Sequence, residues 1–343
     1  MTTDPGQVSA AATLLPAGLP LLRLALSYTL DRATRLPVAK GSMVRGGFGH
    51  ALQRIGCSED CWKKAAACAT ASCVYHQLCE PRRAPGSGPL ADQTTLPRPY
   101  VFQLPDDPRQ QFARGDTLAV GLTLIGSATI QLPQVVLALI ALGRPEDSPE
   151  DRALKRLGIG EDHAPATLAR AAALDLDGNG TAIVSQGIVL QGAMLPQMTT
   201  DDLVRRAATL PPTLRLVCET PLRLKEDSKI LGRFSVTALT RALLFRLTSM
   251  AAAFCSTPWW PDHQHLVALA TQVRVADDRT RWVERARISN RTGDPQTVEL
   301  SGLVGSVLLQ DVPPALRALL LTGSFVHAGK GTTAGNGQFR LKY

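Results

Sequence analysis

One strand pattern occurs twice in this chain and constrains its architecture more than any other feature. Residues 22–30 alternate leucine and tyrosine with smaller or polar side chains, which predicts a half-buried β-strand. Residues 214–220 open in the same way, with Arg215 at the position that Arg23 holds in the first copy. Two halves of similar construction are therefore expected, and Pro211-Pro212 marks the boundary between them.

We accordingly expect a loose N-terminal tail over residues 1–20, a first domain over 21–210 and a second over 211–343. A length of 343 residues suits two domains, and 45% hydrophobic residues are enough for packed cores. The formal net charge of +8, carried mostly by arginine, favours a nucleic-acid partner, because the planar guanidinium binds phosphate and stacks on bases. An aromatic content of 5% argues against a surface that relies mainly on base stacking.

Nothing in the sequence indicates secretion or a membrane. The first twenty residues contain no lysine or arginine, so they lack the charged start of a signal peptide. The longest apolar run, residues 135–142, is too short to cross a bilayer. Seven cysteines are an odd number, which fits thiols or metal ligands in a reducing compartment. We therefore expect a cytoplasmic protein without membrane contact.

Periodicity predicts several further elements. Residues 116–126 have the continuous apolar character of a central strand, while residues 132–142 and 235–255 have apolar side chains at helical spacing. Residues 175–180 (Asp-Leu-Asp-Gly-Asn-Gly) imitate the start of a calcium loop. The twelfth position is Gln186 where such a loop needs glutamate, and strand-like residues flank the segment. We therefore interpret it as a hairpin turn.

The C-terminal residues 323–341 contain five glycines around His327 and Lys330. Glycine permits positive φ and close backbone approach, so such a loop can surround a phosphate with its own N–H groups. On this interpretation Gly329, Lys330 and Gly331 bind a nucleic-acid backbone. The alternative is a glycine-rich turn between two strands. A nucleoside-triphosphate P-loop is excluded, because residue 331 is glycine where serine or threonine is needed.

A second glycine-rich run lies at residues 37–55. Ser42 is suited to cap a helix that continues to Ile55. Four glycines between residues 41 and 49 destabilise a helix unless another group must approach closely. Lys40, Arg45 and His50 lie near the start of this helix, where free N–H groups favour phosphate. His50 is a candidate acid or base, and the alternative is that it only packs against or caps the helix.

A cysteine cluster follows at positions 57, 61, 68, 73 and 79 (Cys57, Cys61, Cys68, Cys73 and Cys79). Its spacing contains no Cys-x-x-Cys pair, so we favour buried thiols in a small helical insert over a zinc site. Lys63 and Lys64 make the insert a candidate RNA contact. We expect no bound metal and no cofactor.

Four of these stretches, in the same order, resemble the CRISPR pre-crRNA processing endoribonucleases of the repeat-associated mysterious protein (RAMP) superfamily. They are the Lys-Gly-Ser…Arg-Gly-Gly-Phe-Gly-His run at 40–50, Thr-Pro-Leu-Arg-Leu-Lys at 220–225, Gly-Leu-Val-Gly-Ser-Val at 302–307, and residues 323–341. The resemblance spans nearly the whole chain. It implies an α+β fold of tandem ferredoxin-like (RRM-like) domains. The first would carry the helical cysteine-rich insert at about 56–90, and the second the glycine-rich RNA-binding loop.

The resemblance also implies a function: metal-independent cleavage of CRISPR repeat RNA (pre-crRNA) to mature crRNA, by attack of a 2′-hydroxyl, with the product hairpin held afterwards. Such cleavage needs a base, an acid and a cation that stabilises the phosphorane. Histidine suits the proton transfers at neutral pH. The catalytic candidates are His50, His327, Lys40, Arg45 and Arg23. Arg241, Arg246 and Arg340 are further RNA-binding candidates beside those named above.

One alternative function fits the same residues. A non-catalytic RAMP subunit would bind crRNA in a CRISPR effector complex without cutting it. The expected partners are CRISPR RNA and, on either interpretation, other subunits of a type III or type IV complex. RNA processing that survives replacement of His50, His327 and the nearby cations would favour the non-catalytic subunit.

Overall fold

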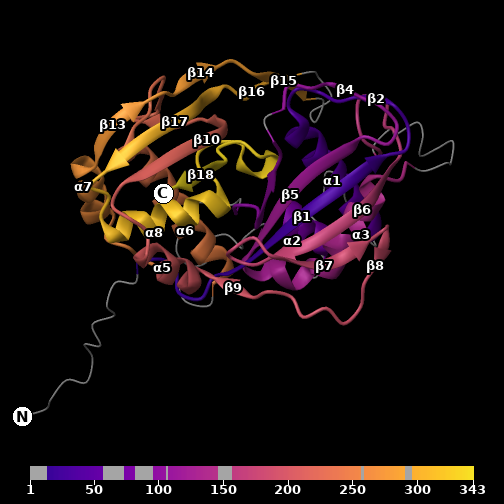
Figure 1. The fold of residues 1–343 in the computed structure, drawn as a ribbon, viewed down its shortest axis with the longest axis horizontal. Helices are drawn as coiled ribbons and strands as arrows, with labels where there is room; N and C mark the ends of the chain where they lie inside the picture. The colour runs from indigo at the N-terminus through magenta and orange to yellow at the C-terminus, as the bar shows by residue number, and fades with distance from the viewer. Residues whose placement is uncertain are drawn as a thin grey trace, which may run out of the picture.

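A computed structural model describes residues 14–56, 73–81, 96–105, 107–145, 157–255, 259–289 and 296–343. Within these residues two large antiparallel sheets lie side by side, each covered by helices on one face (Figure 1), and three two-stranded sheets accompany them. The expected α+β fold is therefore confirmed. None of the helices in the described ranges is long and apolar enough to cross a membrane.

The first sheet has seven strands in the order β3-β5-β1-β6-β7-β8, with β9 paired to the start of β1. The apolar helix α3 and the glycine-rich helix α1 pack against each other on it. The elements of this first half are β1 (Pro20–Leu30), β2 (Thr34–Arg35), α1 (Lys40–Gly56), α2 (Val74–Cys79), β3 (Tyr100–Gln103), β4 (Gln111–Phe112), β5 (Thr117–Ile125), η2 (Gly126–Gln131), α3 (Leu132–Leu142), β6 (Ala166–Leu174), β7 (Gly180–Ser185), β8 (Ile188–Val189), β9 (Met198–Thr199) and α5 (Thr200–Ala208).

The second sheet has five strands in the order β13-β17-β10-β18, with β14 paired to β17. The elements of this second half are β10 (Leu214–Leu222), β11 (Lys225–Glu226), β12 (Lys229–Ile230), α6 (Val236–Phe254), α7 (His263–Gln272), β13 (Arg274–Asp278), β14 (Arg281–Val283), β15 (Ala286–Ser289), β16 (Gln296–Glu299), β17 (Gly302–Gln310), α8 (Pro314–Val326), η3 (Thr332–Ala334) and β18 (Phe339–Lys342). β11 pairs with β12 and β15 with β16, each as a separate hairpin.

Each sheet has its own apolar core, and the second core extends beyond the second half. Apolar residues of the first half contribute to it: Leu15, Leu19 and Leu21 near the N-terminus, and Met198, Leu203, Ala207 and Leu210 around α5. Helix α5 packs against α8. The two halves are thus joined by shared apolar burial, which stabilises their arrangement.

Local sequence signals position several of these elements. Helix α3 has the bounds that its apolar run predicts, and α6 begins directly after Ser235, whose hydroxyl accepts the Ala238 N–H at 3.2 Å. The calcium-like segment is a hairpin turn between β6 and β7, as predicted. There the Asp175 carboxylate accepts the N–H groups of Asp177 and Asn179.

The predicted start of the first helix is wrong. Helix α1 begins at Lys40, two residues before the proposed cap Ser42, whose N–H already donates to Ala39 O at 3.1 Å. The reason lies in the second half of the chain. Gly41 packs so closely against η3 that a Cβ on it would lie 1.9 Å from the Ala334 carbonyl oxygen. This contact places residues 40 and 41 in the buried first turn.

Two kinds of glycine therefore occur in α1: those that a close contact requires, and those beside which a methyl group would fit. A pair of substitutions distinguishes the two kinds. We expect Gly41→Ala to lower the free energy of unfolding by about 1–3 kcal/mol, because its methyl group meets a backbone oxygen that cannot move alone. At Gly46 a methyl group would meet nothing within 4 Å beyond the backbone of its own helix. Gly46→Ala should therefore stabilise the protein by about 0.5–1 kcal/mol through helix propensity. Urea unfolding measures both, and equal effects at the two sites would contradict the contact between Gly41 and η3.

Part of the cysteine cluster can be placed. Cys57, Cys61, Cys68, Lys63 and Lys64 lie outside the described residues. Cys73 precedes α2 and Cys79 is its last residue, and both are buried. Burial raises the pKa of the Cys79 thiol to about 11, which keeps it protonated at neutral pH. In the ranges that the structure describes, no group of three or more histidine, cysteine or acidic side chains is placed to hold a metal ion.

Candidate RNA-binding cleft

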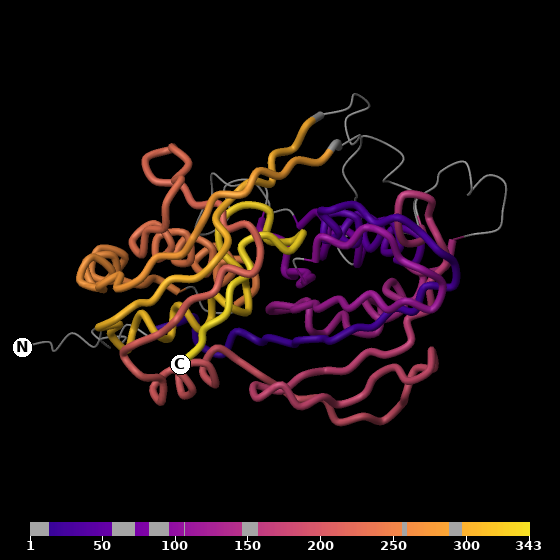
Figure 2. Tube along the Cα trace, turned by 45° about the horizontal axis from the view of Figure 1, so that its top comes forward, coloured from indigo at the N-terminus to yellow at the C-terminus, as the bar shows by residue number. Residues whose placement is uncertain are grey.

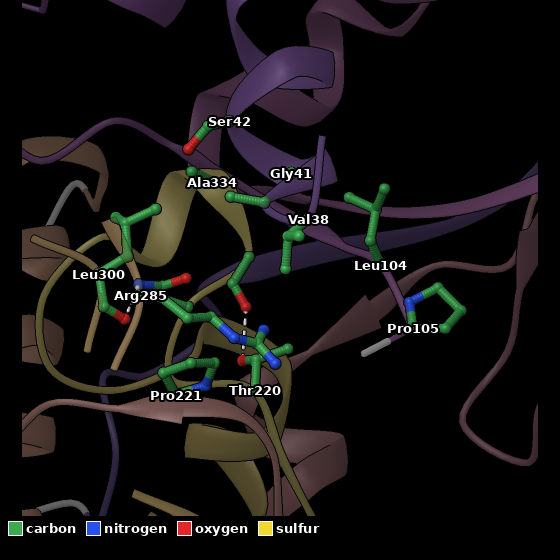
Figure 3. A pocket seen from close by; sticks show the side chains of 13 residues that line it. Val38, Gly41, Ser42, Leu104, Pro105, Thr220, Pro221, Arg285, Leu300 and Ala334 are labelled. Atoms are coloured by element: carbon green, nitrogen blue, oxygen red, sulfur yellow. Dashed lines mark hydrogen bonds between the residues drawn. The ribbon is translucent and has the colours of Figure 1, made fainter. Parts of the chain in front are cut away.

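A small cleft lies where the two halves meet, and the glycine-rich runs form two of its walls (Figure 3). The first half contributes residues around the start of α1 and the end of β3: Val38, Ala39, Gly41, Ser42, Leu104 and Pro105. The second half contributes Thr220, Pro221, Arg285, Leu300, Ala334, Gly335 and Asn336. Three of the four stretches that carried the family resemblance therefore reach one place.

The glycine-rich loop forms the joint between the halves. The interpretation as a turn between two strands is wrong, because α8 continues to Val326 and the loop leads from this helix to β18. In Figure 2 the yellow C-terminal loop extends towards the magenta and violet first half. The Thr220 hydroxyl donates to Gly335 O at 2.7 Å, and Gly337 N–H donates to Pro221 O at 3.0 Å. These bonds fix the inner part of the loop.

The outer part of the loop keeps its backbone donors. In the described part of the chain, no hydrogen bond uses the N–H groups of residues 329–331. Gly329 and Gly331 both have a φ of 77°, which favours glycine. A Cβ on Gly329 would lie 2.4 Å from Arg223 O, so the loop is held against the start of the β11 hairpin. Lys330 is exposed at the tip of this turn.

His327 is buried behind the same loop. It is 0% exposed, and neither ring nitrogen makes a hydrogen bond of ordinary geometry among the described residues, although the backbone of Asn336 and of Thr332 lies near the ring. Burial, assisted by the charge of Arg246, lowers the pKa of His327 to about 3. Its backbone has φ 60° and ψ 169°, a conformation that is rare outside glycine. In this conformation His327 is neutral at pH 7 and is enclosed by the protein.

The candidates on α1 differ from one another. His50 is half-buried on the helix, with Nδ1 3.1 Å from Gln53 Oε1. It lies eight residues beyond Ser42, about 12 Å along the helix axis from the cleft. Lys40 is only 4% exposed, and its ammonium donates to Asp107 O at 2.5 Å within the protein. Arg45 is half-buried, and its charge adds to burial in lowering the pKa of Arg98.

The alternating pattern of β1 would place Arg23 on an open face of the strand, but the side chain is half-buried. Its guanidinium lies 4.8 Å from the centre of the Phe325 ring, a cation–π distance, because α8 covers this end of β1. Burial lowers the pKa of Arg23. The side chain therefore joins the two halves.

The arginines proposed to bind RNA are engaged within the protein. Arg241 pairs with Glu226 at 2.5 Å, and Arg340 pairs with Glu219. Arg246 donates to Val326 O at 2.7 Å, at the carbonyl end of α8, where a cation is favourable. Burial lowers the pKa of Arg246 to about 9. Of the second-half cations named from the sequence, Lys330 is exposed without an ion pair in the described ranges.

Sequence reasoning missed the polar side chains that the second half brings to the cleft. Thr220 holds the loop, and Arg285 and Asn336 line the cleft beside it. Thr220 belongs to a motif that the sequence did single out, but Arg285 belongs to none. Only the fold brings these positions together.

Comparison with known protein families shows which families the two halves of the chain match. Residues 216–339 match the family model "CRISPR-associated endoribonuclease Cas6". Residues 19–195 match a second model, AF_1859_N, described as an N-terminal domain. The chain belongs to a CRISPR Cas6/RAMP-type family. The resemblance noted in the sequence is therefore confirmed. A search of curated proteins found no match.

Solved structures of Cas6 proteins share the fold of this Cas6/RAMP-type chain. Thermus thermophilus Cas6 (TTHB231) is 15% identical, with a TM-score of 0.51 over 95% of this chain and 100% of that one. Its product complex gives a TM-score of 0.52 at 16% identity, over 94% and 99% of the two chains. A "Partial Cas6-RT-Cas1–Cas2 complex" gives 0.57 at 14% identity over 96% of this chain. The chain spans only 47% of that protein, and 29% of the chain in a second such complex.

Proposed function

We propose that this protein is an endoribonuclease that cuts CRISPR repeat RNA in the cytoplasm and remains bound to the product hairpin. Membership of the Cas6/RAMP-type family carries the proposal, since the matched model describes endoribonucleases. The cleft supports it, because the family-like stretches of both halves meet there. The proposed partners are the repeat RNA and other subunits of a type III or type IV effector complex.

The strand orders support a tandem ferredoxin-like arrangement. In the first half the order β1, α1, β3, β5, α3, β6 along the chain gives the sheet order β3-β5-β1-β6. In the second half β10, α6, β13, β17, α8, β18 gives β13-β17-β10-β18. Both follow the β-α-β-β-α-β pattern of that fold. We propose two such domains, over residues 21–210 and 211–343, with RNA bound across their junction and the cysteine-rich insert in the first.

We propose that cleavage proceeds by attack of the 2′-hydroxyl on the adjacent phosphate, without a metal ion. His50 acts as the general acid or base, because it is half-exposed while His327 is enclosed. Arg45, on the same helix, is the nearest candidate cation for the phosphorane charge. The products are a 2′,3′-cyclic phosphate, or its opened form, and a 5′-hydroxyl.

One observation favours the non-catalytic alternative. His50 lies about two helical turns from the cleft, and His327 is enclosed, so the two histidines do not form a preassembled pair. A protein that only holds crRNA needs no such pair. Under this alternative the cleft binds the RNA and another subunit cuts it.

Incubation with the CRISPR repeat RNA of the host array distinguishes the two functions. We expect cleavage in EDTA, and no cleavage when the scissile nucleotide carries a 2′-deoxy sugar. The deoxy substrate removes the nucleophile while leaving the phosphate backbone in place. Tight binding of both RNAs with neither cut would reject the nuclease and establish the RNA-holding subunit.

A further inference from the structure

A chain of side-chain hydrogen bonds connects His50 to the short helix α2. His50 and Gln53 lie three residues apart on α1, a spacing that brings their side chains together. The His50 Nδ1 atom lies 3.1 Å from Gln53 Oε1. Gln53 is in turn a hydrogen-bond partner of the Tyr75 hydroxyl on α2, and that hydroxyl donates to Glu80 Oε1 at 3.4 Å. The packing of α2 against α1 therefore links a carboxylate to the ring of His50.

One direction of donation fits all four groups. The Glu80 carboxylate accepts hydrogen bonds, so the Tyr75 hydroxyl supplies the proton between these two side chains. Burial raises the pKa of Tyr75 to about 12, so the hydroxyl keeps this proton at neutral pH. The Tyr75 oxygen then accepts from the amide nitrogen of Gln53, which turns Gln53 Oε1 towards His50. An amide oxygen carries no proton, so His50 Nδ1 is the donor.

This direction fixes the tautomer of neutral His50. A neutral imidazole carries a single N–H proton, and with that proton on Nδ1 the lone pair of the ring lies on Nε2. Such a ring takes up a proton at Nε2 and has none to give there, which makes it a general base. The hydrogen bond to one ring nitrogen sets the role of the other. Gln53 therefore controls which nitrogen of His50 can react.

We propose that Gln53 is a positioning residue that holds the proton of neutral His50 on Nδ1, so that Nε2 serves as the general base for the 2′-hydroxyl. In this step the 2′ O–H bond breaks and its proton moves to Nε2. The 2′ oxygen bonds to phosphorus, and the 5′ oxygen leaves and takes a proton from water. The inference rests on the proposed nuclease function and decides between the two roles, acid or base, that His50 could have in it.

NMR measures the tautomer without RNA. With nitrogen-labelled histidine in the full chain, we expect the proton of neutral His50 on Nδ1, and His50→Ala assigns the signal. Gln53→Met keeps a long side chain and a good helix former but removes the acceptor, so the proton should move partly or wholly to Nε2. Gln53→Glu keeps an acceptor oxygen and should keep the proton on Nδ1. A wild-type proton on Nε2 would overturn the proposal.

Single-turnover cleavage of CRISPR repeat RNA gives the second readout. We expect Gln53→Met to slow cleavage about 10- to 100-fold, the cost of losing a partner that orients a histidine in metal sites. RNA affinity should be unchanged, because the proposed role of Gln53 is to orient His50 and not to contact RNA. Gln53→Glu should cut at close to the wild-type rate. If Gln53 only stabilised α1, the rate would not follow the presence of an acceptor oxygen.

Gln272→Met makes the same change at an exposed glutamine, the last residue of α7. It should leave both the tautomer of His50 and the cleavage rate unchanged. A Gln53→Met variant that cuts as fast as the wild type would overturn the positioning role and leave the proposed nuclease intact. A wild type that binds the RNA without cutting it would overturn the nuclease, and with it the role of His50 as a base.

Discussion

Replacement of His50 by alanine is expected to slow cleavage of repeat RNA about 100- to 10,000-fold, the usual contribution of one general acid or base. RNA affinity should change little, because the candidate RNA-backbone contacts Gly329, Lys330 and Gly331 lie on the glycine-rich loop and not on α1. Alanine is also the strongest helix former, so α1 should remain intact. Single-turnover rates with enzyme in excess measure the chemical step directly.

His263→Ala is the matched control, because His263 is exposed at the start of α7, on the second half. It should cut at the wild-type rate. If His50→Ala also cuts at the wild-type rate, His50 is not the acid or base and the assignment passes to the cations on α1. If neither the wild type nor the variants cut, the RNA-holding subunit is the better description.

The stability of the protein should depend on pH through His327. Burial lowers its pKa in the folded state to about 3, whereas an unfolded histidine has a value near 6.5. Between these values the unfolded chain binds the proton and the folded chain does not. The contribution of His327 to the free energy of unfolding is therefore complete above about pH 6.5. It decreases as the pH falls, by up to about 1.4 kcal/mol per pH unit, until about pH 3.

Urea unfolding of the wild type and His327→Gln between pH 7 and pH 4.5 measures this contribution. Glutamine does not titrate, so the variant should show a shallower pH dependence even if its stability at pH 7 is lower. The same replacement at the exposed His265 should keep the wild-type dependence. Parallel curves for the wild type and His327→Gln would show that His327 binds a proton as readily in the folded protein as in the unfolded chain, against the enclosed site described here.

Local signals predicted the elements that are stabilised locally. The apolar run of α3, the Ser235 cap of α6 and the Asp175 turn each depend on neighbours a few residues away. The end of α8 could not be predicted in this way. A glycine at position 323 suggests a loop, yet Gly323 lies inside α8. A Cβ at this position would lie 2.7 Å from side-chain atoms of Leu243 and Phe339, so their close packing explains why the residue is glycine. The glycine is a packing requirement imposed by distant residues.

The same distinction between local signals and contacts with distant residues applies to the candidate site. The motifs at 40–50, at 220–225 and around the C-terminal loop could be found in the sequence, and the structure brings them to one cleft. The side chains with which individual cations pair could not be predicted from the sequence. Arg23 packs on Phe325 and Arg241 pairs with Glu226, and both partners belong to elements that only the fold brings near.

The joint made by the glycine-rich loop has a consequence for the order of assembly during translation. Gly41 and Ala334 touch across about 290 residues of sequence, a separation that makes such contacts slow to form. Residues 332–342 supply both η3, which lies on α1 and β3, and β18, which pairs with one side of β10. The ribosome makes these residues after both partners. One surface of the first half therefore stays uncovered until the second sheet is complete, and docking of the two halves is a late step of folding.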